Sequence, residues 1–512
     1  MPTGLRSFFS TALKLSLHTS RTTLALRTMR PLIVIYGSTG TGKSDLAVEL
    51  AARFNGEIIN ADAMQMYKGL PIITNKLREE EQRGIPHHLL GSIGLDEDPW
   101  VMTQFRREAT RIISDIRDRG KIPIVVGGTS YYIDGLLFGR VVDDEKEAGS
   151  DGGAAGLIRD ELAAKYPILN ASAEEMLAKL REVDPVMADK WHPNDYRKIR
   201  TSLEIYFSTG RRASDIYAEQ QRAKESRRQA SSATGEPHPL GDLLLFWLYA
   251  QRDALNARLD QRVDKMMRDG LLTETAEVYD YLQRRLATGE TIDRSKGIWQ
   301  SIGFRQFEPY HAAVAQHKAT TQDSAPNLSA QPDPALEKLK QTGVEDTKTA
   351  TRQYAKYQVR WITLKTLPAL REEGLLNRFY VLDSSDIARW SAEVRDKAVS
   401  LAQQFLDGKA EAMPSPEDLS ETAREVLAGS AERQNRAAGT PCRKVCEVCD
   451  NKVLLTEELW QAHISGKKHQ KNVRAARRRQ LVPASEAPER RLMVVEQPEG
   501  CDNRVGEPIE SV

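Results

Sequence analysis

The residues with the clearest chemistry form a glycine-rich run that ends in lysine and serine. Its spacing is G-x-x-x-x-G-K-S, and its members are Gly37, Ser38, Thr39, Gly40, Thr41, Gly42, Lys43 and Ser44. In such a loop, backbone N–H groups point at phosphate oxygens, Lys43 adds a positive charge, and the Ser44 hydroxyl suits Mg²⁺. The flanking residues 32–36 predict a strand and residues 45–53 a helix, so a chance glycine-rich turn is disfavoured. The sequence predicts a site for a diphosphate or triphosphate.

Polar residues follow two further apolar runs. Residues 57–61 lead into Asp62, and residues 121–126 lead into Gly127, Gly128 and Thr129. In an open parallel sheet the carboxyl ends of the strands share one edge, where ligands bind. An acid and a hydroxyl are therefore expected beside the phosphates. By residue type alone, Asp62 fits a magnesium ligand, a general base or a helix N-cap, and Thr129 fits a turn.

Cysteine and histidine spacing predicts a separate metal site near the C-terminus. Cys446, Cys449, His463 and His469 give C-x₂-C-x₁₃-H-x₅-H, close to the spacing of a structural zinc site. All four cysteines follow residue 441, so a disulfide framework is excluded and a reducing compartment is favoured. Cys442 is an alternative ligand, and Cys501 is expected to be a free thiol.

Basic residues recur at helical spacing in several segments. Arg258 and Arg262 lie one turn apart, although Asp260 and Asp264 alternate with them and also fit an exposed, ion-paired helix. Arg352, Lys356 and Arg360 recur every four residues and give one basic stripe on a helix. Arg197, Lys198 and Arg200 fit a nucleic-acid backbone or a solvated helix face. A further basic stripe that fits a nucleic-acid backbone comprises Lys467, Lys471, Arg474 and Arg478. The last stripe also fits a nuclear-localisation signal.

Six segments occur in an order that is more specific than any one of them. They are the phosphate loop, Asp62–Gly69, His87–Gly91, Gly127–Tyr132, His192–Arg200 and Ser301–Gln306. Together they resemble the tRNA dimethylallyltransferases, also called tRNA isopentenyltransferases, over about residues 31–365, with the C-terminal zinc finger of the eukaryotic members. The resemblance implies transfer of a dimethylallyl group from its diphosphate to N6 of the adenosine that follows the anticodon.

The resemblance also implies roles for individual residues. Asp62 matches the general base, Thr129 a residue at the reacting group, and Arg262, with the loop 37–44, the diphosphate ligands. Residues that match tRNA contacts are Asp62, Ala63, Met64, Gln65, Arg197, Lys198, Ile199, Arg200, Thr201, Arg305, Arg352 and Lys356. Thr201 and Tyr357 stand where the family commonly has basic residues. Mg²⁺ with the diphosphate, structural Zn²⁺, and the tRNA anticodon stem-loop as partner are expected.

The predicted fold is α/β, a parallel sheet containing the phosphate loop with an inserted helical domain and a small zinc finger. We expect a leader at 1–30, a catalytic core at 31–130 and 241–400, a helical tRNA-binding insertion at 131–240, a linker at 408–440, the finger with its basic helix at 441–482, and a disordered tail at 483–512. Residues 311–348 also have the composition of a disordered segment.

Charge and composition indicate which binding partners and which cellular compartments are expected for the protein. Seventy-three basic and 72 acidic residues nearly cancel, so basic character is local. No apolar run reaches the ~20 residues of a membrane helix, and a monomer without membrane contact is expected. The first 44 residues lack Asp and Glu and contain dispersed arginines, which predicts a mitochondrial transit peptide. A second start at Met29 predicts an additional cytoplasmic or nuclear form.

Two other functional classes fit parts of the sequence. A small-molecule kinase that binds ATP explains the loop and Asp62, but not the segment Gly127–Thr129 or the insertion. An RNA-binding zinc-finger protein with an inactive enzyme domain explains the finger and basic helices, but not the intact Lys43, Ser44 and Asp62.

Overall fold

The structure is a computed structural model that describes residues 30–139, 162–219, 221–222, 225, 238–321, 333–409, 412–438, 440–449 and 451–480. The chain divides into two units, Met1–Ala438 and Gly439–Val512. The predicted leader, except Arg30, and the predicted tail lie outside the described residues.

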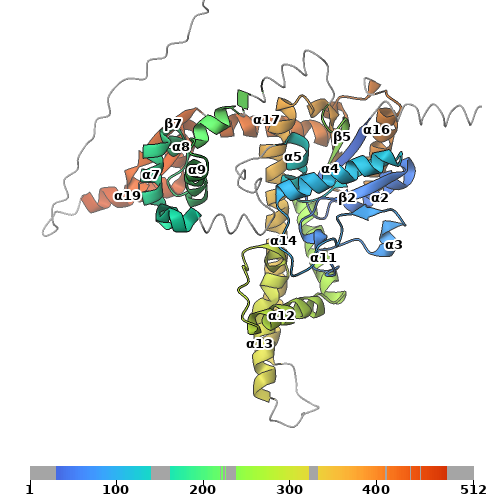
Figure 1. Cartoon of the computed structure of the whole chain (residues 1–512), viewed down its shortest axis with the longest axis horizontal. Helices are drawn as coiled ribbons and strands as arrows, with labels where there is room; N and C mark the ends of the chain where they lie inside the picture. The colour runs from blue at the N-terminus through green and yellow to red at the C-terminus, as the bar shows by residue number, and fades with distance from the viewer. Residues whose placement is uncertain are drawn as a thin grey trace, which may run out of the picture. The chain divides into compact units, whose positions relative to one another are not determined.

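Six parallel strands form one sheet in the order β3-β2-β4-β1-β5-β6 (Figure 1). They are β1 (Pro31–Gly37), β2 (Gly56–Asn60), β3 (His87–His88), β4 (Ile122–Val126), β5 (Asp242–Tyr249) and β6 (Phe379–Asp383). The central strand β1 pairs with β5 along its whole length and with β4 on its other side. The predicted parallel sheet and the three strands anticipated from apolar runs are confirmed.

Both faces of the sheet are covered, which explains why its strands are continuous apolar runs. Leu32, Val34 and Tyr36 face the core that includes α4 (Met102–Asp118) and α5 (Ser130–Phe138). The alternate residues of β1 face the core formed with α2 (Lys43–Phe54) and α16 (Lys397–Leu406). Each fully buried aliphatic side chain contributes roughly 1.5–3 kcal/mol. This two-sided burial holds the carboxyl edge of the sheet in place.

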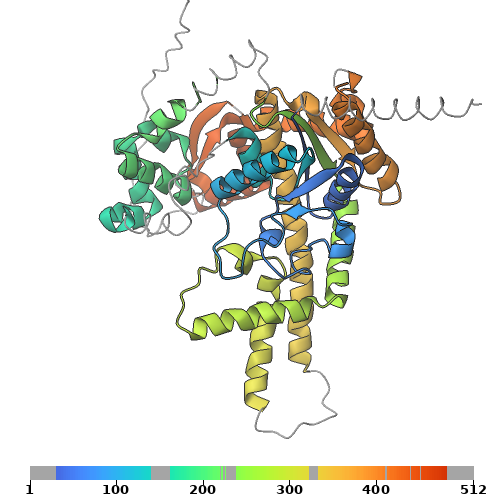
Figure 2. The ribbon, with the colours of Figure 1, turned by 45° about the vertical axis from the view of Figure 1, so that its right-hand side comes forward.

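Four longer helices extend the core. They are α11 (Arg252–Arg268), α12 (Leu271–Ala287), α13 (Phe304–Thr321) and α14 (Pro334–Trp361). In both views α13 and α14 lie side by side (Figures 1 and 2). A Cβ at Gly343 of α14 would lie 2.7 Å from the Phe307 ring of α13, so the glycine permits this close packing.

Several short elements and the 18-residue helix α17 also belong to the first unit. They are η1 (Met64–Met66), α3 (Glu79–Gln82), η3 (Gly297–Gln300), η4 (Ile362–Thr366), α15 (Leu367–Glu372), η5 (Leu376–Arg378), η6 (Ser391–Asp396), η8 (Pro416–Asp418) and α17 (Glu421–Ala438). Two of them, η4 and η6, are π-helical and continue into α15 and α16.

The inserted domain is helical, as predicted, but it begins later than residue 131. Its described elements are η2 (Pro167–Asn170), α7 (Ala173–Val183), α8 (Pro185–Lys190) and α9 (Tyr196–Thr209), which share a separate apolar core. Helix α5 instead buries Tyr132 and Ile133 against the sheet. Its apolar residues belong to the catalytic core, so the predicted boundary at 131 is too early.

The prediction of disorder at 311–348 and of a linker at 408–440 is wrong for much of both segments. Residues 334–348 lie in α14, and α17 packs Ala423 and Leu427 into the main core. Thr422 also donates a 2.7 Å hydrogen bond to Asp383 at the end of β6. Alanine, glutamate and glutamine favour helices as well as disordered chains, and a few apolar residues per two turns suffice to dock a helix.

The second unit contains a hairpin and two helices. Its elements are β7 (Pro441–Cys446), η9 (Glu447–Cys449), β8 (Lys452–Thr456), α18 (Glu457–Ser465) and α19 (Lys467–Gln480). Strands β7 and β8 pair antiparallel. Across the described residues of both units, no helix has the combined length and apolar character needed to cross a membrane.

Candidate functional site

The phosphate loop is preformed at the start of α2. Gly40 and Gly42 have φ values of 82° and 83°, a left-handed conformation that favours glycine. Inside the loop, Lys43 Nζ donates to the Ser38 carbonyl at 2.6 Å and Thr41 Oγ1 donates to the same oxygen at 2.9 Å. The 12-residue helix α2 directs its N-terminus toward this loop. The arrangement suits an anion, because the first N–H groups of a helix lack partners within the helix.

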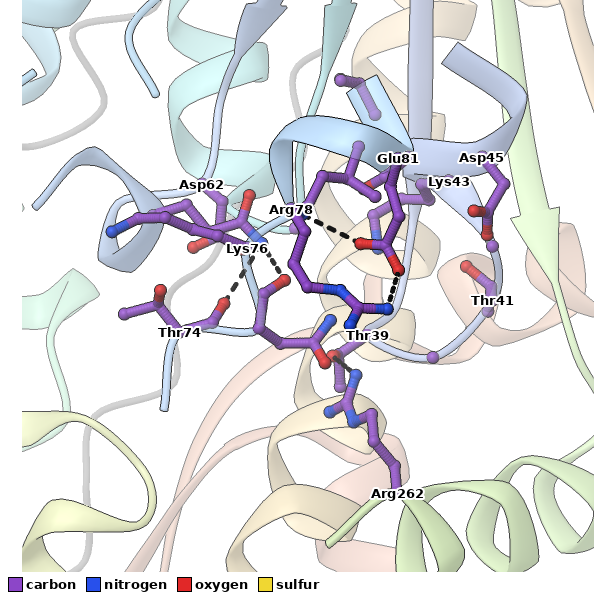
Figure 3. Close-up of a pocket in the computed structure, with 18 of the residues that line it drawn as sticks. Thr39, Thr41, Lys43, Asp45, Asp62, Thr74, Lys76, Arg78, Glu81 and Arg262 are labelled. Atoms are coloured by element: carbon purple, nitrogen blue, oxygen red, sulfur yellow. Dashed lines mark hydrogen bonds and ion pairs between the residues drawn. The ribbon is translucent and has the colours of Figure 1, made fainter. Parts of the chain in front are cut away.

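A pocket of about 1180 Å³ opens beside this loop (Figure 3). Its walls come from the loop, residues 71–78, α11 and the segment 387–391. Seven cationic residues line it, namely Lys43, Lys76, Arg78, Arg258, Arg262, Lys265 and Arg268, against four acids, Asp45, Asp62, Glu81 and Asp269. The balance of charge favours a ligand with several negative charges.

The two arginines of α11 have different partners. Arg262 Nη1 donates to Thr39 Oγ1 at 2.9 Å, and burial lowers the pKa of Arg262 to about 10, so it is protonated at neutral pH (Figure 3). Arg258 donates to the carbonyls of Gly40, Ser384 and Ser385 at 2.7–3.1 Å. Arg258 therefore braces the loop, whereas Arg262 offers charge to the pocket. The alternative of an exposed, ion-paired helix does not describe these two side chains.

Asp62 lies just beyond β2 at the carboxyl edge of the sheet. Its Oδ1 accepts from the Met64 N–H at 3.1 Å, which orients the carboxylate. Burial raises the pKa of Asp62, although Lys43 and the backbone N–H groups of Met64 and Gln65 oppose this shift. Burial lowers the pKa of Lys43 to about 8, against the attraction of Asp62. The site thus holds a carboxylate with increased proton affinity beside a lysine that is still mostly charged at pH 7.

Thr129 hydrogen-bonds the residues on either side of Asp62, which agrees with the shared sheet edge expected for the two segments. Its Oγ1 accepts from the Ala63 N–H at 3.1 Å, and its own N–H donates to Ala61 O at 3.2 Å. The Tyr354 side chain also hydrogen-bonds Thr129, and burial raises the pKa of Tyr354. Thr129 therefore ties the Asp62 loop to α14.

Gln358 of α14 is a site residue that the sequence analysis missed. Its Oε1 accepts from the Thr39 N–H at 2.8 Å, and its Nε2 donates to Gly128 O at 2.9 Å. The side chain is 2% exposed and joins the phosphate loop to the glycine pair. The sequence contained one indication that Gln358 is buried. Gln358 and Thr351 lie one heptad apart, on the face of the helix opposite to the basic stripe of Arg352, Lys356 and Arg360.

Gln65 and its neighbours hold another wall of the pocket. Gln65 Nε2 donates to Thr74 O at 3.2 Å and Asn75 O at 3.0 Å. Glu274 of α12 accepts from the N–H groups of Ile72 and Ile73 at 3.0 and 2.6 Å. The segment 70–76 is therefore fixed from both sides, and Gln65 lines the pocket with Asp62.

The basic residues predicted in the insertion lie on α9. Arg197, Lys198 and Thr201 line a second hollow of about 460 Å³, together with Tyr131 and Trp361 of the core. Lys198 also pairs with Asp195, and Arg200 pairs with the buried Glu204 at 2.9 Å. Ile199 is fully buried in the core of the insertion, so its side chain cannot contact RNA. Helix periodicity explains this, because position 199 faces inward.

The remaining predicted tRNA residues lie on the long helices. Arg305 of α13 and Lys356 of α14 are exposed. Arg352 pairs with Asp260 of α11, so it also holds α14 against α11. Tyr357 is 56% exposed.

In the second unit the four predicted metal ligands converge. Ligand atoms of Cys446, Cys449, His463 and His469 lie within 4.8 Å of one another. His463 Nε2 is buried without a hydrogen-bond partner, and His469 Nδ1 lies 3.4 and 3.6 Å from the two sulfurs. Two thiolates and two imidazoles form a donor set that is compatible with zinc. Cys442 instead hydrogen-bonds Glu457, and Cys501 lies outside the described residues.

A parallel sheet with a phosphate loop, a buried carboxylate at its carboxyl edge and a strongly basic pocket defines a P-loop α/β protein that binds a phosphorylated ligand. The family models described as IPP transferase and isopentenyl transferase match residues 65–365 and 30–97. The chain belongs to the tRNA dimethylallyltransferase family, which confirms the resemblance.

Individual relatives span most of the chain. The tRNA dimethylallyltransferase of Schizosaccharomyces pombe is 36% identical over 469 residues, which cover 88% of this chain and 96% of the relative. That of Homo sapiens is 33% identical, covering 88% and 87%. A solved structure of a eukaryotic dimethylallyltransferase acting on tRNA has a TM-score of 0.66 and 31% identity, covering 88% of this chain and 98% of that one.

Proposed function

We propose that this protein transfers the dimethylallyl group of dimethylallyl diphosphate to N6 of the adenosine next to the 3′ side of the anticodon in tRNA. The observation that carries the proposal is the placement of Asp62 beside a preformed phosphate loop in a chain of this family. The reaction needs a base that accepts the N6 proton, which Asp62 can provide, and a site that binds the diphosphate leaving group, which the phosphate loop can provide.

The phosphate loop holds the diphosphate that leaves. Negative charge grows on the diphosphate as the carbon–oxygen bond breaks. The backbone N–H groups of the loop, Lys43 and Arg262 stabilise that charge in a pocket where they are already oriented. The Ser44 hydroxyl and the diphosphate oxygens suit Mg²⁺, which when bound supplies further charge neutralisation.

Asp62 is the general base. The N6 lone pair forms a bond to C1 of the dimethylallyl group, and the electron pair of the C1–O bond leaves with diphosphate. The proton of the N6 amine passes to Asp62. Its raised pKa favours this transfer, because a buried carboxylate gains more by becoming neutral than an exposed one.

The adenine must leave its stack to reach Asp62, at a cost of a few kcal/mol. Gln65 also lines the pocket wall, and because its Nε2 donates to Thr74 O and Asn75 O, its Oε1 is the atom that can accept a hydrogen bond from the base edge. Thr129 keeps the Asp62 loop in position. Arg197, Lys198 and the aromatic side chains Tyr131 and Trp361 around the second hollow suit RNA phosphates and unstacked bases.

The second unit contributes RNA affinity through its fold. Zn²⁺ held by Cys446, Cys449, His463 and His469 would stabilise this small unit. The exposed basic residues Lys467, Lys471 and Arg474 on α19 suit an RNA backbone. We also propose that the enzyme is delivered to mitochondria by residues 1–30 and that a form started at Met29 serves the cytoplasm or nucleus.

The test is a reaction of purified protein with total tRNA and dimethylallyl diphosphate, followed by mass analysis of the nucleosides. A modified adenosine carrying one dimethylallyl group is expected, with one diphosphate released per transfer and no ATP consumed. Unmodified adenosine together with ATP hydrolysis would instead favour the kinase class. RNA binding without either reaction would favour an inactive enzyme domain.

A further inference from the structure

Unpartnered polar atoms gather around the phosphate-loop pocket. Among the described residues, seven buried side-chain N or O atoms lack a hydrogen-bond partner. Four of the seven belong to residues that line this one pocket: His87 Nε2, Arg258 Nε, Arg262 Nε and Trp390 Nε1. His87 Nδ1 faces the Ile85 carbonyl at 2.8 Å, so Nε2 of the neutral ring is an acceptor, whereas the other three atoms are donors. A buried donor without a partner is unfavourable, so these three call for a ligand that accepts a hydrogen bond.

Trp390 is the unexpected member of this set. It lies seven residues beyond the end of β6, and Ile387 and Ser391 of the same segment also line the pocket. Both ranges matched by the family models end before it, at residues 97 and 365. No motif in the sequence assigns it a role.

The indole N–H of Trp390 lies against the phosphate loop. A Cβ built on Gly42 would be 2.8 Å from Trp390 Nε1 and 3.6 Å from Asp45 Oδ2. The ring thus approaches the loop where α2 begins, at a position that only glycine allows. The indole nitrogen can donate a hydrogen bond but cannot accept one, so its partner must be an acceptor such as a phosphate oxygen.

Arg258 holds this segment against the loop, and a second contact fixes its turn. Arg258 donates from one guanidinium to Gly40 O in the loop and to Ser384 O and Ser385 O, which precede Trp390. Asp383 accepts from the Ser385 N–H at 2.8 Å and fixes the turn that leaves β6. The indole is therefore placed by the fold before any ligand binds.

We propose that Trp390 donates its indole N–H to a phosphate oxygen of the prenyl diphosphate held by the loop. This inference rests on the proposed function for the identity of the ligand. It adds a donor from the C-terminal part of the first unit to those of the loop and Arg262. A hydrogen bond to a charged oxygen is about twice as strong as one between neutral groups.

The test compares Trp390→Phe with the unaltered full-length protein in titrations of inorganic diphosphate with Mg²⁺. The phenyl ring keeps most of the packing and removes the donor. Affinity for diphosphate should fall about 10-fold, and KM for dimethylallyl diphosphate should rise by a similar factor while KM for tRNA stays constant. Replacing Trp390 with benzothienyl-alanine, whose sulfur occupies the N–H position, should give the same loss with the ring shape retained.

Trp247→Phe is the matched control. Trp247 Nε1 is also buried without a partner, but this residue lies within β5 and does not line the pocket. The Trp247→Phe variant should bind diphosphate with the same affinity as the unaltered protein. Unchanged affinity in both Trp390 variants, or an equal loss in Trp247→Phe, would overturn the proposal. If the unaltered protein binds diphosphate but modifies no tRNA, the proposed function fails while the Trp390 contact is still tested by binding.

Discussion

At the scale of single residues, the site depends on three charged groups whose proton affinities are shifted by burial. Asp62 has a raised pKa, and the pKa values of Lys43 and Arg262 are lowered to about 8 and about 10. Desolvation is the largest cause for each group. A ligand with several negative charges would compensate the desolvation of the two cations, whose nearby acid Asp62 offsets it only in part.

Asp62 gives the most direct test of the proposed chemistry. Asp62→Asn keeps an oxygen for the Met64 N–H but cannot take the N6 proton at neutral pH. Turnover should fall by about 10²-fold or more, because general-base catalysis contributes 10² to 10⁴, while tRNA affinity stays within about twofold. Single-turnover kinetics and filter binding measure the two quantities. Asp62→Ala should behave alike, and an undiminished rate in either variant would remove Asp62 from the mechanism.

Lys43 predicts a distinctive pH dependence. Its charge attracts diphosphate and is lost as pH rises through its pKa of about 8, so kcat/KM for dimethylallyl diphosphate should decline on the alkaline side of pH 8. Lys43→Ala should weaken diphosphate binding by about 10- to 100-fold. Lys43→Arg retains a charge that does not titrate in this range and should show a lower but flat profile from pH 7.5 to about 9.5. A decline of equal steepness in the arginine variant would assign the titration to another group.

At the scale of elements, α14 joins two loops that are far apart in the sequence. Gln358 accepts from the Thr39 N–H and donates to Gly128 O, which also accepts from the Ser130 N–H. Removing the amide therefore leaves the Thr39 N–H without this partner and deletes one of the two hydrogen bonds to Gly128 O; an unpartnered N–H costs about 1–3 kcal/mol. Gln358→Leu should therefore lower kcat and raise KM for dimethylallyl diphosphate together by about tenfold, with a drop in melting temperature.

The exposed Gln353 on the same helix is the matched control. Gln353→Leu changes the same residue type without touching either loop, so its kinetics should equal those of the unaltered protein. Equal kinetics for Gln358→Leu would mean that the two loops hold their positions without this bridge.

Some elements and contacts of the fold could be predicted from the sequence, and others could not. The strands and the approach of Asp62 to Thr129 were predictable, because apolar runs form parallel strands whose ends share an edge. Gln358 and Trp390 were not, since the loop residues that they approach lie more than 200 residues away in the sequence and no local pattern encodes the pairing. Helices 334–348 and 421–438 were mistaken for disorder, because their sparse apolar residues become informative only when the receiving surface is known.

At the scale of the whole molecule, the proposed mitochondrial targeting by residues 1–30 can be tested directly. Residues 1–30 fused to a fluorescent reporter should enter mitochondria, because the segment is basic and contains no acidic residue. Replacing Arg6, Lys14, Arg21 and Arg27 with glutamate should leave the reporter diffuse. Expression from Met29 alone should place the full protein in the cytoplasm or nucleus. A diffuse reporter with the native segment would contradict a targeting role.

The last prediction concerns the proposed roles of the two units, with the chemistry in the first unit and additional RNA affinity from the second. The four candidate ligands of the second unit would complete a four-coordinate Zn²⁺ site, so no open coordination position would be left to activate a substrate. Cys449→Ser should remove zinc, unfold this unit and raise KM for tRNA about 10-fold or more, since α19 then loses its position. Turnover at saturating tRNA should stay nearly unchanged.

Cys442→Ser is the matched control, because Cys442 lies in the same hairpin but outside the ligand cluster. It should keep one zinc per chain and an unaltered KM for tRNA, as measured by metal analysis and steady-state kinetics on full-length protein. A collapse of saturated turnover in Cys449→Ser, with the first unit still folded by circular dichroism, would place the finger in the chemistry. The separation of KM from kcat is expected because the proposed chemistry uses only groups of the first unit, whereas the proposed RNA contacts lie on both units.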